Sequence, residues 1–148
     1  MTKQVDLDKY TSFVNGTTSY PSKSNEEFIA RIQQLSERDV PIARLMTAAV
    51  GLTAEAGEFT EIVKKIAFQG KELTDDNRTH LIKELGDVYW YFTQALIGLD
   101  INLNEVVLTN VMKLTARYPE GAFDVYRSEN RVEGDIWPNL CYDRGTPK

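Results

Sequence analysis

Two pairs of acidic residues stand out because each pair can place two carboxylates on one side of a helix. Glu55 and Glu58 form the first pair, and Glu84 and Asp87 form the second. Residues at positions i and i+3 share a helix face, so both members of a pair project together. Carboxylates held close together repel one another, and a divalent cation relieves the repulsion. The spacing therefore favours a metal site, with solvated acids on exposed helix faces as the alternative.

The other ligand types in the chain indicate which cation would fit. Oxygen ligands alone favour Mg²⁺ or Mn²⁺, whereas zinc prefers histidine and cysteine. The chain has one histidine, His80, and one cysteine, Cys141. His80 precedes Glu84 by one helical turn, which is not the repeated Glu-x-x-His register of a di-iron bundle. A phosphodiesterase-like hydrolase would need two histidine-rich ligand sets, which one histidine cannot supply.

The acid pairs lie in two stretches whose apolar residues recur at helical spacing. The first stretch predicts a helix from Pro41 to Gln69, which Gly70 ends. The second predicts a helix from Thr74 or Asp75 to about Leu99. If these helices pack antiparallel, as their short connection suggests, the four carboxylates converge near the core. The expected apolar stripe of the first helix consists of Leu45, Ala49, Leu52, Ala56, Phe59, Val63 and Ile66.

Two further helices complete the predicted fold. One runs from Asn25 to about Arg38, and the other from Asn102 or Leu103 to Arg117. Residues 1–24 contain turn-forming residues and are expected to be an irregular arm, and the C-terminal part is expected to be irregular, with a short helical piece near residues 123–131. With no alternation of strands and helices, the fold class is all-α, a helical bundle of about four helices.

Length and charge restrict the partners. The chain has 148 residues, enough for about one domain, and a net charge of −5, which disfavours a nucleic acid polymer as partner. No window approaches the apolar length of a membrane span, and the first ten residues lack an apolar signal core. We therefore expect a cytoplasmic protein with no membrane partner. An acidic protein that accepts a nucleotide needs a metal ion or a local basic cluster at the phosphates.

The acid pairs and their flanks resemble the MazG-like family of all-α nucleoside triphosphate pyrophosphohydrolases. The family motif is E-x-x-E followed, on the next helix, by E-x-x-D. Around it, the segments "LTAEAGEFTEIVKK" and "LIKELGDVYWYF" are similar to the family's two metal helices. Downstream, "NVMKLTARYPEGAF" and "SENRVEGDI" are similar to compact, single-domain members. The resemblance covers about residues 28–136. It places a MazG-like catalytic domain at 25–136, after the arm and before a tail at 137–148.

The resemblance implies a reaction and a set of roles. The four acids would bind Mg²⁺, for which Mn²⁺ can substitute, and Glu58 would orient or deprotonate the attacking water. A nucleoside triphosphate would be cleaved between its α- and β-phosphates to a monophosphate and pyrophosphate. Lys113 and Arg117 share a helix face with Asn110 and would hold the substrate phosphates. The alternative for these basic residues is a role as helix-end charges that suit the helix dipole.

Aromatic residues of the Thr74–Leu99 stretch raise two further expectations. Trp90 and Tyr91 could stack on the base of the substrate, or could serve only in packing. Aromatic residues on every side of the helix suggest contacts on more than one face. This pattern predicts an oligomer, and the resemblance implies a homodimer or a dimer-of-dimers tetramer. The competing function is a non-catalytic, oligomeric helical-bundle interaction module whose acids are solvated or bind a metal without turnover.

Overall fold

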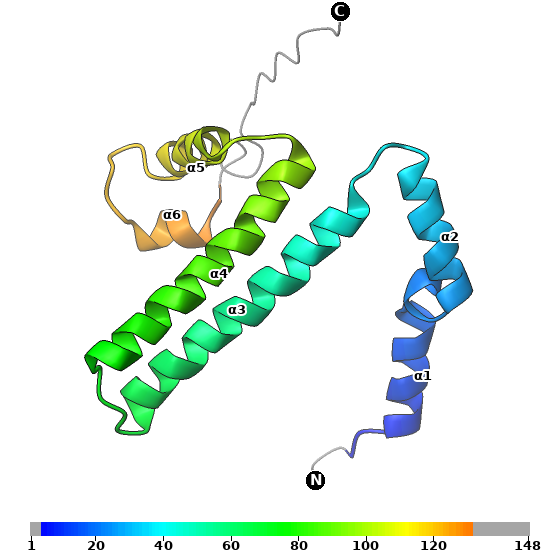
Figure 1. Cartoon of the computed structure of the whole chain (residues 1–148). Coiled ribbons are helices and arrows are strands. Elements are labelled where there is room, and N and C mark those ends of the chain that lie inside the picture. The colour runs from blue at the N-terminus through cyan, green and yellow to red at the C-terminus, as the bar shows by residue number, and fades with distance from the viewer. Residues whose placement is uncertain (1–3, 132–148) are drawn as a thin grey trace, which may run out of the picture. The chain divides into compact units, whose positions relative to one another are not determined.

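The computed structural model describes residues 4–131, and all regular structure in that range is helical. The chain divides into two compact units, Met1–Gly98 and Leu99–Lys148. The elements appear in Figure 1: α1 (Leu7–Thr17), η1 (Tyr20–Ser22), α2 (Asn25–Ser36), α3 (Ile42–Phe68), α4 (Asp75–Leu99), α5 (Leu103–Arg117) and α6 (Val125–Glu129). The all-α prediction is confirmed. The predicted domain bounds stay a prediction, and the tail at 137–148 lies outside the described residues.

Helix starts follow local capping signals in the sequence. The Ser24 side chain accepts a hydrogen bond from the Glu27 amide at the start of α2. Asn102 and Glu105 form a reciprocal capping box at the start of α5, so that two otherwise unsatisfied amides gain partners. At the end of α3, Gly70 takes a φ of 71°, a left-handed conformation that glycine adopts without strain.

The expectation of an irregular N-terminal arm is wrong, because residues 7–17 form α1. The Asp6 side chain accepts a hydrogen bond of 3.0 Å from the Lys9 amide and so caps the helix. Near the other end, the Thr17 hydroxyl donates to the Phe13 carbonyl. Asn15 and Gly16, two of the turn-forming residues of this segment, lie inside the last helical turn, and the helix ends at Thr17. Every residue of α1 is exposed.

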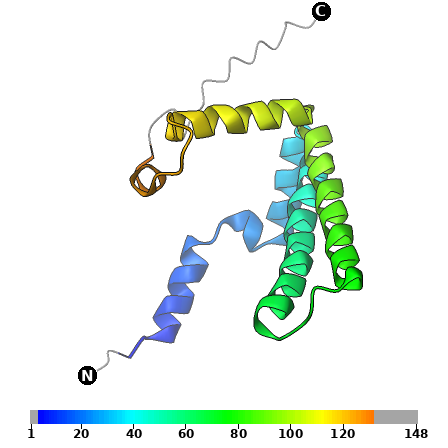
Figure 2. The ribbon, with the colours of Figure 1, turned by 90° about the vertical axis from the view of Figure 1, so that its left-hand side faces the viewer.

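The first unit is built around the α3–α4 hairpin. The two long helices lie side by side and antiparallel in both Figure 1 and Figure 2, joined by a short connection. The Arg44 guanidinium donates a 2.9 Å hydrogen bond to the Gln94 side chain and links the two helices near their open end. Gly51 allows close approach, because a Cβ at this position would overlap the ring of Tyr91.

The buried face of α3 is rotated from the apolar stripe that the sequence predicted. Ala49, Ala56 and Val63 are exposed, whereas Ala48 and Ile62 are buried. Because α4 lies against Gly51, the interface includes the side of α3 that carries the acid pair. The predicted stripe therefore overlaps the buried face only in part, and its remaining residues are half-buried: Leu45, Leu52, Phe59 and Ile66.

Few apolar side chains are shielded within a single chain. Among the described residues, the buried apolar ones are Ala48, Ile62 and Leu96, and no large side chain is completely buried. In the same range, no single helix is long and apolar enough to cross a membrane. Taken together, α4 and α5 have the length and apolar composition of a span, but the helix breaks between them.

Candidate metal centre

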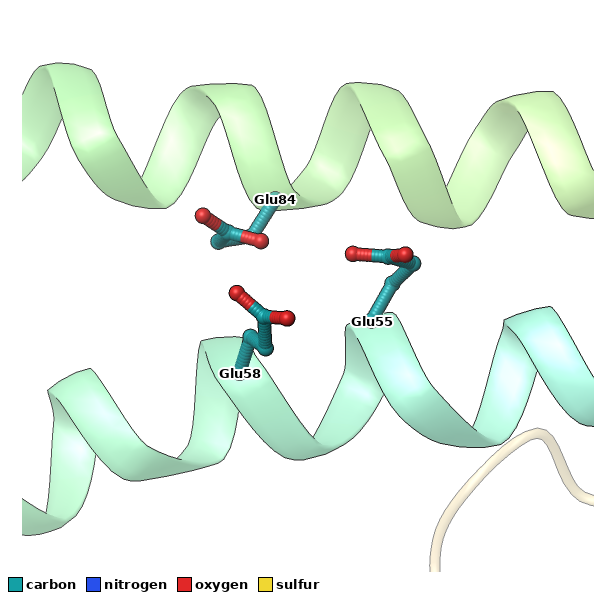
Figure 3. A group of neighbouring side chains, drawn as sticks. All are labelled: Glu55, Glu58 and Glu84. Carbon is teal, nitrogen blue, oxygen red and sulfur yellow. The ribbon is translucent and has the colours of Figure 1, made fainter.

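Three carboxylates meet across the middle of the hairpin. Glu55 and Glu58 project from neighbouring turns of α3, and Glu84 projects from α4 toward them (Figure 3). Each of the three offers an oxygen, and these oxygens lie within 4.8 Å of one another. The two helices run antiparallel, so the middle of α3, which carries Glu55 and Glu58, lies opposite the part of α4 that carries Glu84.

Asp87, the fourth predicted ligand, lies outside this group of three. Its charge is nevertheless close enough to raise the pKa of the Glu55 carboxyl. One helical turn separates Asp87 from Glu84, so it extends the acidic surface along α4. The structure thus brings three of the four predicted ligands together and places the fourth nearby, and the ligand assignment itself stays a prediction.

The three carboxylates differ in burial. Glu84 is 6% exposed, Glu55 is half-buried and Glu58 is exposed. Burial raises the pKa of the Glu55 carboxyl above its usual value. The nearby charges of Glu58, Asp87 and Glu84 raise the same pKa further. In the part of the chain that the structure describes, no lysine or arginine forms an ion pair with any of the three.

A divalent cation fits this arrangement chemically. Three converging carboxylates with no lysine or arginine paired to them among the described residues carry excess negative charge, and one of them is almost fully shielded from water. The donors are all carboxylate oxygens, the type that hard cations such as Mg²⁺ and Mn²⁺ prefer. The residues present therefore fit the metal that the acid pairs predicted.

One partner of the cluster was missed from the sequence. The Nε2 of His80 lies 2.9 Å from Oε1 of Glu84, one turn along α4. The spacing of four residues could have signalled this contact, because residues i and i+4 of a helix are neighbours. The sequence analysis considers His80 only as a direct metal ligand, whereas in the structure it contacts a carboxylate.

The predicted phosphate-binding residues lie in the second unit, on α5. Lys113 and Arg117 are half-buried and one turn apart, and Asn110 is exposed one turn earlier. The Arg117 guanidinium lies 5.8 Å from the ring centre of Tyr118, within range of a cation–π contact. Their role at the substrate stays a prediction.

An open apolar hollow of about 310 Å³ also lies in the second unit. Its walls come from α5 and the segment that follows it, and include Leu114, Tyr118 and Phe123. Among the described residues, no acidic side chain lines this hollow, so they do not offer a second metal centre there.

The two aromatic candidates for base stacking have different surroundings. Trp90 is 53% exposed, and its ring meets that of Tyr91 edge to face, with centroids 4.8 Å apart. Tyr91 instead packs over Gly51 in the gap between α3 and α4. The base-stacking role stays a prediction for both residues, with more accessible ring surface at Trp90.

Comparison with known proteins agrees with this geometry. The family described as "MazG nucleotide pyrophosphohydrolase domain" matches residues 45–122, more than half of the 148 residues, and the match includes all three clustered glutamates. The Gene 37 protein of Mycobacterium phage L5 is 42% identical over 82 residues, which cover 54% of this chain and 71% of the phage protein. No solved structure matches the chain significantly.

Proposed function

Because the chain belongs to the MazG nucleotide pyrophosphohydrolase family, we propose that it hydrolyses nucleoside triphosphates with the help of Mg²⁺. The proposed cleavage lies between the α- and β-phosphates and releases a nucleoside monophosphate and pyrophosphate. The observation that carries the proposal is the group of three glutamate oxygens within 4.8 Å, one carboxylate being almost fully buried. Such a group favours a cation, and a nucleotide's phosphates are a ligand that a cation attracts.

Each residue of the cluster has a proposed task. Glu55, Glu58, Glu84 and the nearby Asp87 would hold the cation, which would act as a Lewis acid toward the phosphate and the attacking water. Glu58 is the most exposed member of the group of three, and so the best placed to contact that water. It would orient the water and accept its proton as the new bond to the α-phosphorus forms and the bond to the departing pyrophosphate breaks. Mn²⁺ is expected to replace Mg²⁺, since both accept carboxylate oxygens.

Basic side chains are proposed to hold the polyphosphate. Lys113 and Arg117, with Asn110, would contact its phosphate oxygens. An arginine can engage a phosphate through two parallel hydrogen bonds, whereas a lysine acts as a point charge. The support for this role is their shared face on α5 and the need of an acidic protein for local positive charge.

A homo-oligomer, a dimer or a dimer of dimers, is also proposed. Its support is the exposed apolar surface of α4, where six large side chains are between 52% and 59% exposed: Ile82, Leu85, Tyr89, Trp90, Ile97 and Leu99. A monomer rarely leaves so much contiguous apolar surface in water. Light scattering at micromolar concentration should give a dimeric or tetrameric mass, and a monomeric mass would contradict the proposal.

The deciding experiment incubates the protein with a panel of canonical and damaged nucleoside triphosphates and Mg²⁺. The expected products are pyrophosphate and a monophosphate, in amounts that fall to background when a chelator is in excess. Orthophosphate as the product would mean a different cleavage position. No product from any triphosphate, in a protein that still binds the cation, would favour the non-catalytic interaction module.

A further inference from the structure

The most deeply buried carboxylate of the hairpin is held by a histidine rather than by a lysine or arginine. Glu84 is 6% exposed, and a carboxylate shielded to that degree is costly unless it accepts a hydrogen bond. The Nε2 of His80 lies 2.9 Å from its Oε1. The histidine side chain is itself 52% exposed, so the contact joins the buried carboxylate to the surface of α4.

The geometry of this contact leaves Glu84 able to bind a cation. The 2.9 Å contact involves only Oε1 of Glu84, so the second oxygen keeps its lone pairs for another partner. Both residues stand on the same helix, one turn apart, and the helical backbone fixes their separation. A carboxylate held in this way loses less side-chain freedom when a cation binds, because its orientation is already restricted.

The histidine itself stays outside the group of ligand atoms. The ligand atoms within 4.8 Å of one another come from Glu55, Glu58 and Glu84, and no nitrogen of His80 is among them. We propose that His80 is a positioning residue, which donates its Nε2–H to Glu84 and orients that carboxylate toward the cation. This inference rests on the proposed function in one respect: it takes Glu84 to be a metal ligand.

A competing explanation is that His80 and Glu84 form only a helix-stabilising pair, as residues four apart often do. The two explanations differ in what happens to metal affinity. Hydrogen-bond partners of metal ligands typically change affinity by about 10- to 100-fold when removed. A pair that stabilises only the helix would change the melting temperature of the metal-free protein and leave the affinity unaltered.

The test measures Mn²⁺ binding to the full chain by electron paramagnetic resonance and calorimetry. His80→Ala should weaken binding by about 10- to 100-fold. His80→Gln, which keeps an N–H donor on a flexible side chain, should recover most of the affinity. Thr79→Ala is the matched control, because Thr79 is an exposed neighbour for which the structure shows no contact with Glu84, and it should bind like wild type.

Three results would overturn the inference. The first is an equal affinity for Mn²⁺ in His80→Ala and wild type. Failure of His80→Gln to recover affinity would exclude a hydrogen-bond role. Nitrogen hyperfine coupling in the Mn²⁺ spectrum of wild type would make His80 a ligand rather than a positioning residue. Absence of Mn²⁺ binding in wild type would be a different failure, that of the proposed function, and would remove the inference with it.

Discussion

Two neighbouring turns of α3 carry glutamates in opposite electrostatic surroundings. Glu55, Glu58 and Glu61 follow one another at intervals of three residues. A hydrogen bond from Lys64 lowers the pKa of Glu61, and Lys65 lies 3.4 Å from its second oxygen. Burial raises the pKa of Glu55, which has no basic partner among the described residues. The pKa values of two glutamates on the same helix are thus shifted in opposite directions.

The spacing of acids therefore does not by itself identify a metal site. Glu58 and Glu61 are also three residues apart, so the first acid pair and this one look alike locally. Two features separate them: Glu84 on the opposite helix approaches Glu55 and Glu58, and lysines on the same helix neutralise Glu61. The site therefore depends on which helix lies across the gap.

The largest expected effect separates Glu58 from Glu61. Glu58→Gln should lower turnover by about 10²–10⁴-fold, because it removes the group proposed to accept the proton of water. Glu61→Gln should leave turnover within about twofold of wild type, since Glu61 is engaged with lysines and lies outside the cluster. Both are measured as pyrophosphate release, with circular dichroism to confirm an intact fold. Equal losses in the two variants would remove the distinction between the two turns.

The next effect contrasts the two basic residues proposed to contact the substrate with a lysine that is paired with an acid. Lys113→Ala and Arg117→Ala should each lower kcat/KM by about 10- to 100-fold, since a charged hydrogen bond is worth about 1.5–3 kcal/mol. Lys64→Ala is the control and should have little effect, because Lys64 is paired with Glu61. The losses should be similar for every base in a panel of dNTPs. A reordered substrate ranking would mean that these residues recognise the base.

Metal binding should stabilise the protein through the acids of the cluster and not through Glu61. A cation that binds only the folded state adds about 2.7 kcal/mol at a hundredfold excess over its dissociation constant. Wild type and Glu61→Gln should therefore melt at a higher temperature in Mg²⁺. The double variant Glu84→Gln/Asp87→Asn should lose this increase. An equal increase in all three proteins would place the cation elsewhere.

The smallest effect is a pH dependence of opposite sign in the metal-free protein. The pKa of Glu55 is raised by folding, so its ionised form destabilises the fold at neutral pH, and the penalty disappears as pH falls through that raised pKa. The lowered pKa of Glu61 means that its contribution is stabilising at neutral pH and is lost as pH falls through the folded-state pKa.

Thermal melts of two variants should show this contrast. At pH 7 without metal, Glu55→Gln should melt above wild type and Glu61→Gln below it. Both differences should shrink as the pH falls, that of Glu55→Gln first because the pKa of Glu55 is raised, and that of Glu61→Gln at lower pH because the pKa of Glu61 is lowered. Shifts of the same sign at pH 7 would contradict the electrostatic difference between the two turns.

Local signals predicted most of the helices, and tertiary effects account for what was missed. The start of α5 was predicted because Asn102 is a capping residue whose effect is local, and α4 was expected to end at Leu99, as it does. The helix at 7–17 was missed because the turn-forming residues Asn15 and Gly16 favour a loop, whereas Asp6 caps a helix. The rotation of the buried face of α3 could not be predicted, since it depends on the neighbour across Gly51.

The candidate site shows the same limit. The residue types of the two acid pairs predicted a hard-cation site, and the structure groups Glu55, Glu58 and Glu84. The unequal burial of these acids follows from the packing of two helices, which spacing along one helix does not encode. The contact of His80 with Glu84 was visible as a spacing of four residues, but its importance depends on the burial of Glu84.

The close approach at Gly51 has a consequence for the choice between ions of different size. Gly51 stands one turn before Glu55, so the tight contact with Tyr91 limits how far the two helices can spread at the cluster. Mg²⁺ binds oxygen at about 2.0–2.1 Å, whereas Ca²⁺ needs about 2.3–2.6 Å and more ligands. We therefore expect the cluster to bind the smaller ion more tightly. Gly51→Ala should widen the gap and raise the affinity for Ca²⁺ relative to Mg²⁺ in calorimetric titrations, and an unchanged ratio would show that the hairpin does not set ion size.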